Sequence, residues 1–170
     1  MTEQMLHDSA GTIALPSARS IRAYREQAPA MAAEVTRRLR ERPDREQLIG
    51  ASNEAAMELN HRNHTQFIAA WLEHPEPRVL VETVLWVYRS YQSHGFSLAY
   101  WPVQLDLWLR EITARLDAEA AGELRPLYDW LLWQHATFAA LSAEQAGDAA
   151  GDSRAELHGE ASNEASRPAA

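Results

Sequence analysis

The sequence predicts an all-α protein, a single helical bundle of about five to seven helices. Apolar residues recur three or four positions apart along most of the chain, which is the spacing of an amphipathic helix. Proline, glycine and capping residues separate these stretches, whereas strand-like alternation and Asn-Gly or Asp-Gly hairpin turns are missing. The sequence has no internal repeat and no sustained heptad, so we expect a compact domain rather than a coiled coil.

Proline and capping residues set the first two expected helices. Pro29 suits the first turn of a helix, and Pro43 ends that helix after about Arg42. Asp44 and Gln47 resemble a capping box for a short helix that ends near residue 50. The apolar stripe of the first of these helices consists of Met31, Val35 and Leu39.

The next two helices are longer. Ser52 or Asn53 caps a helix of about 20 residues that ends before Pro75. Pro77 opens the following helix, and Gly95 ends it. Apolar residues cover a wide arc of the helix between Pro77 and Gly95, so we expect several neighbouring helices to pack against it.

Two further helices complete the expected domain. Pro102 starts a helix that runs to about Ala121, because Gly122 follows it as a helix breaker. Pro126 lies in the first turn of the last helix, which extends to about Leu141.

The chain has 170 residues, enough for one domain with a substantial core. We expect residues 17–146 to form this domain and residues 1–16 to be loosely ordered. Residues 147–170 consist mainly of Ala, Gly, Ser, Asp and Glu, which offer too little apolar surface to offset the entropy of ordering. They are expected to form a disordered acidic tail.

Composition excludes several classes of function. The net charge of −8 argues against nucleic-acid binding, which needs a basic surface. The chain has no cysteine, so it has no disulfide, thiolate metal site or cysteine nucleophile. No apolar run approaches the roughly 18 residues of a membrane span, and the polar first residues do not form a signal peptide. We therefore expect a cytoplasmic protein with no membrane partner.

Four of the seven histidines fall inside the helical region and are the main candidate ligand residues. They are His61, His64, His94 and His135. All six tryptophans lie between residues 71 and 133, so aromatic rings surround these histidines. The rings form either a core or a pocket for a flat ligand, and the histidines are either ordinary buried polar residues or ligands of a metal or haem iron.

Glu58 and His61 have the Glu-x-x-His spacing of di-iron helical bundles. This pair supports an alternative function, a non-haem iron oxidase or oxygenase. A di-iron site needs a second Glu-x-x-His, but Tyr91 precedes His94 by three residues and Leu132 precedes His135.

The segment from Arg89 to Gly95 allows two interpretations. Basic residues and a glycine at the end of a helix are typical of a helix C-cap. Alternatively, Arg89 or His94 faces a ligand carboxylate, which arginine binds through two hydrogen bonds.

Several motifs together resemble the globin-like helical sensor domains of bacterial regulators. They are His64-x-x-Phe67, Trp71-Leu72, Tyr88-Arg89-Ser90-Tyr91, His94-Gly95-Phe96-Ser97, Leu105 and Trp108. This family includes the N-terminal domains of RsbR-type stressosome proteins and the helical domains that precede some cobalamin-binding modules. The resemblance covers about residues 50–142 and implies a globin-like fold, or a related bundle. It further implies a non-catalytic sensor or ligand-binding domain that acts through a protein partner, with haem or another tetrapyrrole as a cofactor held by one of the histidines.

We also predict a homodimer, because two-fold pairing commonly covers an apolar face that a small domain leaves exposed. One candidate face is the stripe of Met31, Val35 and Leu39. The favoured face consists of Trp101, Leu107 and Trp108, because tryptophans are enriched in interface cores. The opposing interpretation is that these rings are interior and that the chain is a monomer.

Overall fold

A computed structural model describes residues 2–144, and helices are its only regular elements, as predicted. In chain order the helices are α1 (Glu3–Ala10), α2 (Ala18–Arg40), α3 (Arg45–Ile49), α4 (Glu54–Glu73), α5 (Pro77–Ser93), α6 (Tyr100–Arg115) and α7 (Ala118–Trp133). A turn at Gln134 separates α7 from an eighth helix at residues 135–144. The described residues thus contain eight helices, more than the expected five to seven.

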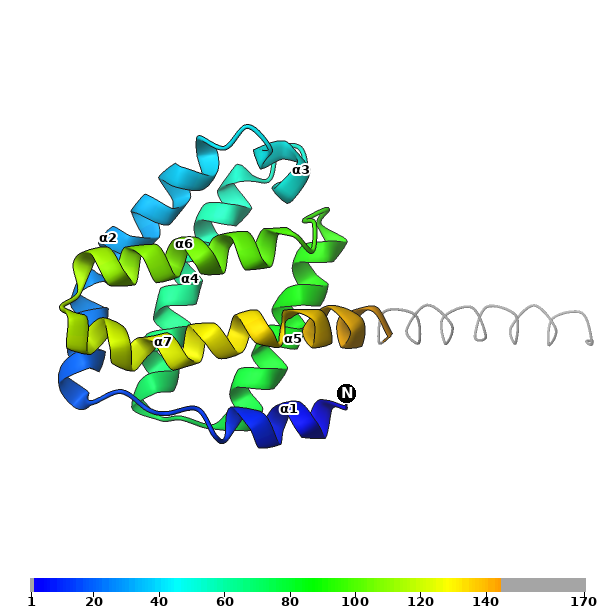
Figure 1. The fold of residues 1–170 in the computed structure, drawn as a ribbon. Coiled ribbons are helices and arrows are strands. Elements are labelled where there is room, and N and C mark those ends of the chain that lie inside the picture. The colour runs from blue at the N-terminus through cyan, green and yellow to red at the C-terminus, as the bar shows by residue number, and fades with distance from the viewer. Residues whose placement is uncertain (1, 145–170) are drawn as a thin grey trace, which may run out of the picture.

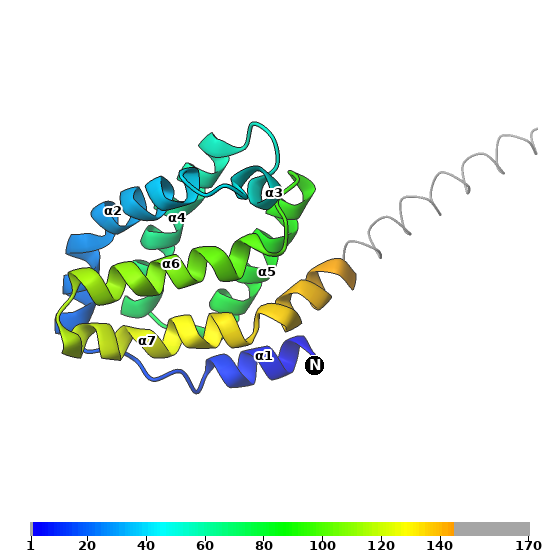
Figure 2. The same cartoon turned by 45° about the horizontal axis from the view of Figure 1, so that its top comes forward.

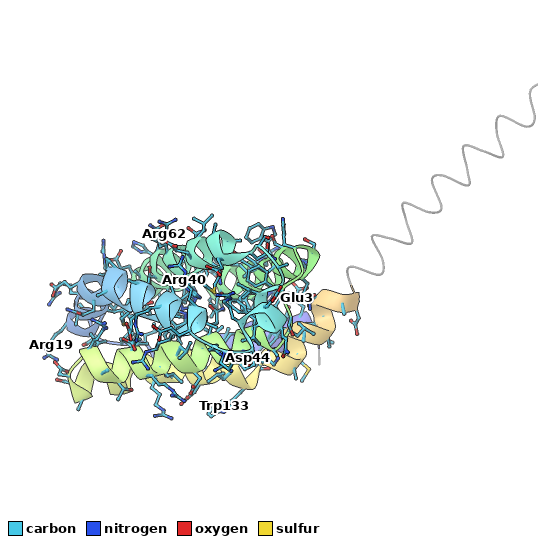
Figure 3. The ribbon with its side chains drawn as sticks, turned by 90° about the horizontal axis from the view of Figure 1, so that it is seen from above. Glu3, Arg19, Arg40, Asp44, Arg62 and Trp133 are labelled. Carbon is cyan, nitrogen blue, oxygen red and sulfur yellow. The ribbon has the colours of Figure 1, made fainter. Side chains whose placement is uncertain are left out.

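The helices pack in layers around α2. Helices α6 and α7 lie side by side on one face, in front of α2 and α4 (Figure 1). Helix α4 packs along α2 on the other side. Figure 3, seen from above, labels Arg62 on α4 at one face and Trp133 at the end of α7 at the opposite face. Helix α5 packs mainly against α1, so it is joined to the bundle less extensively than α4.

Aromatic side chains fill the middle of this arrangement. The largest fully buried side chains include Trp108, Tyr24, Tyr100, Tyr128 and Phe138. The prediction that the aromatic rings between residues 71 and 138 form a core is therefore confirmed for Tyr100, Trp108, Tyr128 and Phe138. The core leaves polar atoms that need partners, and these atoms form the hydrogen-bonded chains described below.

Both faces that we assigned to a dimer interface are buried within a single chain. Met31, Val35 and Leu39 are fully buried, and Trp101, Leu107 and Trp108 are each less than a tenth exposed. The assignment of these two faces was wrong, because α2 and α6 pack against each other and other helices cover them. A homodimer stays a prediction, and its interface would lie elsewhere on the surface.

The N-terminal residues differ from the expectation of loose order. Thr2 caps α1 by accepting a hydrogen bond from the amide of Met5, and Leu6 and Ala10 of this helix are buried. The indole Nε1 of Trp130 donates to Ser9 Oγ at 3.1 Å, which joins α1 to α7. Figure 2 shows α1 lying along the bundle next to α7. Two well-placed apolar residues are enough to order a short helix when a neighbour can bury them.

Helix α2 begins eleven residues before Pro29, the expected start. Ser17 caps it, and Glu123 of α7 accepts hydrogen bonds from both the backbone amide and the hydroxyl of Ser17. Tyr24 in the added segment is fully buried. A proline inside a helix costs about 3 kcal/mol, and these tertiary contacts offset that cost.

The boundary between α6 and α7 also lies elsewhere than expected. Helix α6 ends at Arg115, and Asp117 caps α7 by accepting a hydrogen bond from the amide of Ala120. Gly122 and Pro126 are both inside α7, although we expected them to break and to start a helix. The Asp117 cap and the buried face of α7 outweigh both unfavourable residues.

Two turns meet at one end of the molecule, after α3 and after α5. Gly50 and Gly95 both have positive φ angles, of 75° and 90°, and a side chain at Gly50 would meet the carbonyl oxygen of Gly95. Asn53 Nδ2 donates to the carbonyl oxygens of Ile49 and His94, each at 2.7 Å. The turn at His94 and Gly95 is therefore a helix C-cap, in agreement with the structural interpretation of this segment.

None of the helices within residues 2–144 is both long and apolar enough to cross a membrane. The tail predicted for residues 147–170 lies outside the described residues.

Candidate functional site

A cavity of about 160 Å³ lies between α4 and α5, and residues of α6 and α7 complete its wall. Its lining residues are Asn60, Asn63, His64, Phe67, Ile68, Thr83, Val84, Trp86, Val87, Tyr88, Trp101, Gln104, Leu105 and Leu131. The residues from α4 recur three or four positions apart, so one face of this helix forms one side of the cavity. Trp86 is 60% exposed, which places this ring at the boundary between the cavity and solvent.

The wall of the cavity is uncharged. Among the described residues that line it there is no Asp, Glu, Lys or Arg. Burial lowers the pKa of His64 to about 3, so this imidazole is neutral at physiological pH. Burial also raises the pKa of Tyr88, which therefore keeps its proton. The cavity is thus an apolar space that offers only neutral polar groups.

His61 lies directly behind this wall and is fully buried. Thr36 Oγ1 donates its one proton to the carbonyl oxygen of Ala32 at 2.8 Å. Towards His61 the Thr36 hydroxyl oxygen can therefore only accept, and it accepts from Nδ1–H of His61 at 2.7 Å. Burial lowers the pKa of His61 to about 3, and nearby His64 and Arg40 act in the same direction. The neutral ring therefore carries its proton on Nδ1, and both of its nitrogens are used.

The hydrogen-bonded chain continues from His61 to the cavity. Because Nε2 of His61 has no proton, it accepts from the hydroxyl of Tyr100 at 3.1 Å. The Tyr100 oxygen accepts in turn from Nδ2 of Asn60 at 2.9 Å. Asn60 lines the cavity, and its amide also reaches Oε1 of Gln104, another lining residue, at 3.4 Å. One continuous chain of hydrogen bonds therefore fixes the polar end of the cavity wall.

His64 is held by aromatic residues. Its Nε2 lies 3.0 Å from the hydroxyl of Tyr128, which also bonds the hydroxyl of Tyr24 at 3.0 Å. The imidazole stacks on the indole of Trp108, with 4.8 Å between ring centroids. These contacts fix the ring at the cavity wall.

Tyr88 and Trp101 form an aromatic corner of the cavity. Their rings stack with 4.6 Å between centroids and 12° between planes. The hydroxyl of Tyr88 forms a hydrogen bond of 2.8 Å with Nδ1 of His135, whose pKa burial lowers. His135 thus supports the cavity from the eighth helix without lining it.

The remaining predicted site residues lie away from the cavity. His94 is exposed at the end of α5, and its Nδ1 lies 2.6 Å from the carbonyl oxygen of Ser90. Arg89 lies on α5, four residues before its last residue, and is not part of the cavity wall. The structure therefore brings His61, His64 and His135 around one space and leaves His94 and Arg89 outside it.

The pair of Glu58 and His61 does not form a metal site in this structure. Glu58 pairs with Arg40 at 2.6 Å and with Arg62 at 3.9 Å on the surface, whereas His61 is hydrogen-bonded in the core. Among the described residues, no group of three or more His, Cys, Asp or Glu is arranged to hold a metal ion. The residues present do not fit the alternative of non-haem iron.

A tetrapyrrole does not fit this arrangement either. The cavity of about 160 Å³ is smaller than the roughly 300–1,000 Å³ of pockets that hold drug-sized ligands. Both nitrogens of His61 have partners, and Nε2 of His64 is engaged by Tyr128. Haem would need a larger space than this cavity offers.

Comparison with known proteins finds no relative. No protein-family model, curated protein or solved structure matches the chain. The resemblance to globin-like sensor domains therefore stays a prediction, and the function is inferred from the cavity alone.

Most of the site was missed in the sequence, including Asn60, Gln104 and Thr36. Asn60 precedes His64 by four residues, so it shares the same helix face, and this spacing was a usable signal. Thr36 and Gln104 had no comparable signal, because the contacts that define their roles join helices far apart in the sequence.

Proposed function

We propose that this chain is a non-catalytic ligand-binding domain that takes a small apolar molecule into the cavity between α4 and α5. The observation that carries the proposal is the cavity itself, which is lined mainly by aliphatic and aromatic side chains. An apolar cavity of roughly 150 Å³ in another protein stays dry and binds benzene or xenon. A volume of about 160 Å³ therefore suits a molecule with a single ring.

The chemistry of the wall favours binding over catalysis. General acid–base catalysis works best when the pKa of the catalytic group lies near the working pH. His64 has a pKa of about 3 and the tyrosine hydroxyl of Tyr88 keeps its proton, so neither group exchanges a proton readily near neutral pH.

The position of the cavity suits a sensor. A ligand between α4 and α5 would contact both helices, and α5 is otherwise held mainly by α1. Ligand binding would thus fix α5 relative to the rest of the bundle, and a protein partner that contacts α5 could detect this change.

Toluene binding tests the proposal. We expect toluene to raise the melting temperature of the wild-type chain, because a ligand that binds only the folded state stabilises it. Val84→Phe fills the cavity and should abolish this shift. Val79→Phe is the matched control, since Val79 lies on the same helix, is about half exposed and is not part of the wall. Absence of a shift in the wild type, or an unchanged shift in Val84→Phe, would contradict the proposal.

A further inference from the structure

Two amide side chains at the polar end of the cavity each keep one atom without a partner. Asn60 and Gln104 line the cavity and are only 6% and 2% exposed. Within residues 2–144, Oδ1 of Asn60 and Nε2 of Gln104 form no hydrogen bond, yet neither is among the unpaired atoms that the protein covers completely. Because both side chains are otherwise buried, the surface that these two atoms keep lies at the cavity. The wall therefore presents one free acceptor and one free donor.

The hydrogen-bonded chain behind the wall decides which atom of each amide is free. Tyr100 donates its one proton to Nε2 of His61, so towards Asn60 its oxygen can only accept. The Asn60 atom at Tyr100 must therefore be Nδ2, and the second proton of Nδ2 is directed to Oε1 of Gln104 at 3.4 Å. Both amide protons of Asn60 and the oxygen of Gln104 are thus committed. This leaves Oδ1 of Asn60 as the acceptor and Nε2 of Gln104 as the donor.

The other polar groups of the wall have less need of a ligand. The hydroxyl of Tyr88 bonds to His135, and Nε2 of His64 bonds to Tyr128. Asn63 is exposed, so water can satisfy its amide. A polar atom that is buried and unpaired is unfavourable, and a ligand that pairs with it removes this cost.

The wall also restricts the charge of the ligand. No Asp, Glu, Lys or Arg lines the cavity, and burial lowers the pKa of His64 to about 3, so this ring is neutral at pH 7. Moving an ion from water into such a space costs far more than moving a neutral molecule. An anionic or cationic ligand would find no counter-charge there.

We infer that the ligand is a neutral single-ring carboxamide, whose N–H donates to Oδ1 of Asn60 and whose carbonyl oxygen accepts from Nε2 of Gln104. The inference rests on the proposed function and narrows it to a ligand class: aromatic carboxamides and the chemically similar lactams. The two amide side chains are in contact, so a single small group of the ligand can reach both. Aromatic rings in the wall favour a flat partner, and the size of the cavity limits it to about one ring.

Three probes of nearly equal shape test this assignment by calorimetric titration at pH 7. Benzamide has both the donor and the acceptor. Acetophenone replaces the NH₂ group of benzamide by methyl, and α-methylstyrene also replaces the carbonyl oxygen by carbon. The three probes differ in their hydration in water, so the ratio of two dissociation constants is compared between the wild type and each variant. The hydration of the free probes cancels in this comparison.

Two variants each remove one of the free atoms. Gln104→Met has a similar size but no donor, so acetophenone should lose about three- to tenfold in affinity relative to α-methylstyrene, the usual effect of one buried hydrogen bond. Asn60→Leu removes the acceptor, and benzamide should lose a similar factor relative to acetophenone. Asn63→Leu is the matched control, because it makes the same change at an exposed wall position of the same helix and should leave both ratios unchanged. An unchanged ratio in Gln104→Met or in Asn60→Leu would overturn the inference.

A measurement on the wild-type chain covers the case in which a variant does not fold. In ¹⁵N-labelled protein the assigned side-chain amide signal of Gln104 reports directly on the donor. Benzamide and acetophenone should move this signal downfield, as expected for a new hydrogen bond, whereas α-methylstyrene should not. An equal response to all three probes, or binding of toluene without any response of Gln104 to benzamide, would contradict the inference. Failure of toluene and of all three probes to bind would instead reject the proposed function.

Discussion

Both ring nitrogens of His61 are committed inside the fold, and Thr36 holds one of them in place. The hydroxyl of Thr36 accepts from Nδ1–H while donating to the carbonyl oxygen of Ala32. This arrangement makes His61 part of the support behind the cavity rather than a ligand residue. A polar residue in a helical core can therefore serve function indirectly, by fixing the wall that a ligand contacts.

The hydroxyl of Thr36 can be removed with little change in shape. We expect Thr36→Val to lower the free energy of unfolding by about 1–3 kcal/mol, because it leaves a buried imidazole N–H without an acceptor. Thr36→Ser keeps the hydroxyl and serves as the control. Urea unfolding followed by circular dichroism measures both variants. Equal stability of the two variants would show that the bond to His61 contributes nothing.

Two histidines with lowered pKa values, the fully buried His61 and the partly buried His64, also make stability depend on pH. His61 and His64 have pKa values of about 3 in the folded chain, compared with about 6.5 for an unfolded histidine. Between these values the unfolded state binds more protons than the folded state, so stability falls as the pH falls. The loss is at most about 1.4 kcal/mol per pH unit for each histidine.

Urea unfolding at pH 7 and pH 5 tests this dependence. We expect a clear loss of stability at pH 5, in a range where the carboxylates of the chain stay mostly ionised. His64→Gln keeps a hydrogen-bond donor towards Tyr128 but does not titrate, so its loss should be smaller than that of the wild type, with His61 and His135 supplying the remainder. Identical stability of the wild type at both pH values would mean that the pKa values of these histidines are not lowered in the folded chain.

At the scale of single helices, α1 shows how tertiary contacts decide which segments are ordered. Leu6 is completely buried, whereas Met5, its neighbour, is 52% exposed. Helices this short are not stable in isolation, so the burial of Leu6 must contribute to the order of α1.

Alanine substitutions in α1 test this contribution. We expect Leu6→Ala to reduce the free energy of unfolding by about 2–5 kcal/mol, the usual range for a fully buried leucine. Met5→Ala should change it little, since that side chain is largely in solvent. Chemical denaturation measures both. If Leu6→Ala were as stable as Met5→Ala, the first sixteen residues would be loosely ordered after all.

The helical class and the middle of the chain could be predicted from the sequence, because they depend on local signals. Pro77 starts α5 and Gly95 follows its end, as expected from their backbone preferences. Pro29 and Pro126 misled the prediction, since both lie inside helices that distant contacts stabilise. The bond from Ser17 to Glu123 spans 106 residues, and no local pattern indicates it.

The candidate site could be predicted only in part for the same reason. His64 and the surrounding aromatic residues were recognisable from composition and spacing. The separation of His61 from Glu58 was not, because both lie on neighbouring positions of α4 and only tertiary contacts turn Glu58 towards Arg40 at the surface and His61 into the core. The cavity itself is a property of how α4 and α5 pack, and the sequence of neither helix shows it.

At the scale of the whole molecule, the fold places a strong core beside a weaker junction. Helices α2, α4, α6 and α7 share extensive contacts, whereas α5 is joined mainly through α1 and through aromatic contacts such as the stack of Tyr88 on Trp101. The cavity lies at this junction. A small ligand there would add contacts where the protein has few, which is the physical basis of the proposed binding function.

A crystal of the chain under xenon pressure tests the cavity most directly. Xenon binds apolar cavities of roughly 150 Å³ without needing a polar partner, so the experiment does not depend on the identity of the natural ligand. We predict xenon density between α4 and α5, in contact with Val84, Leu105 and Phe67. The same experiment on Val84→Phe should show no density there. A wild-type crystal without xenon at this position, or with side chains that close the space, would contradict the account.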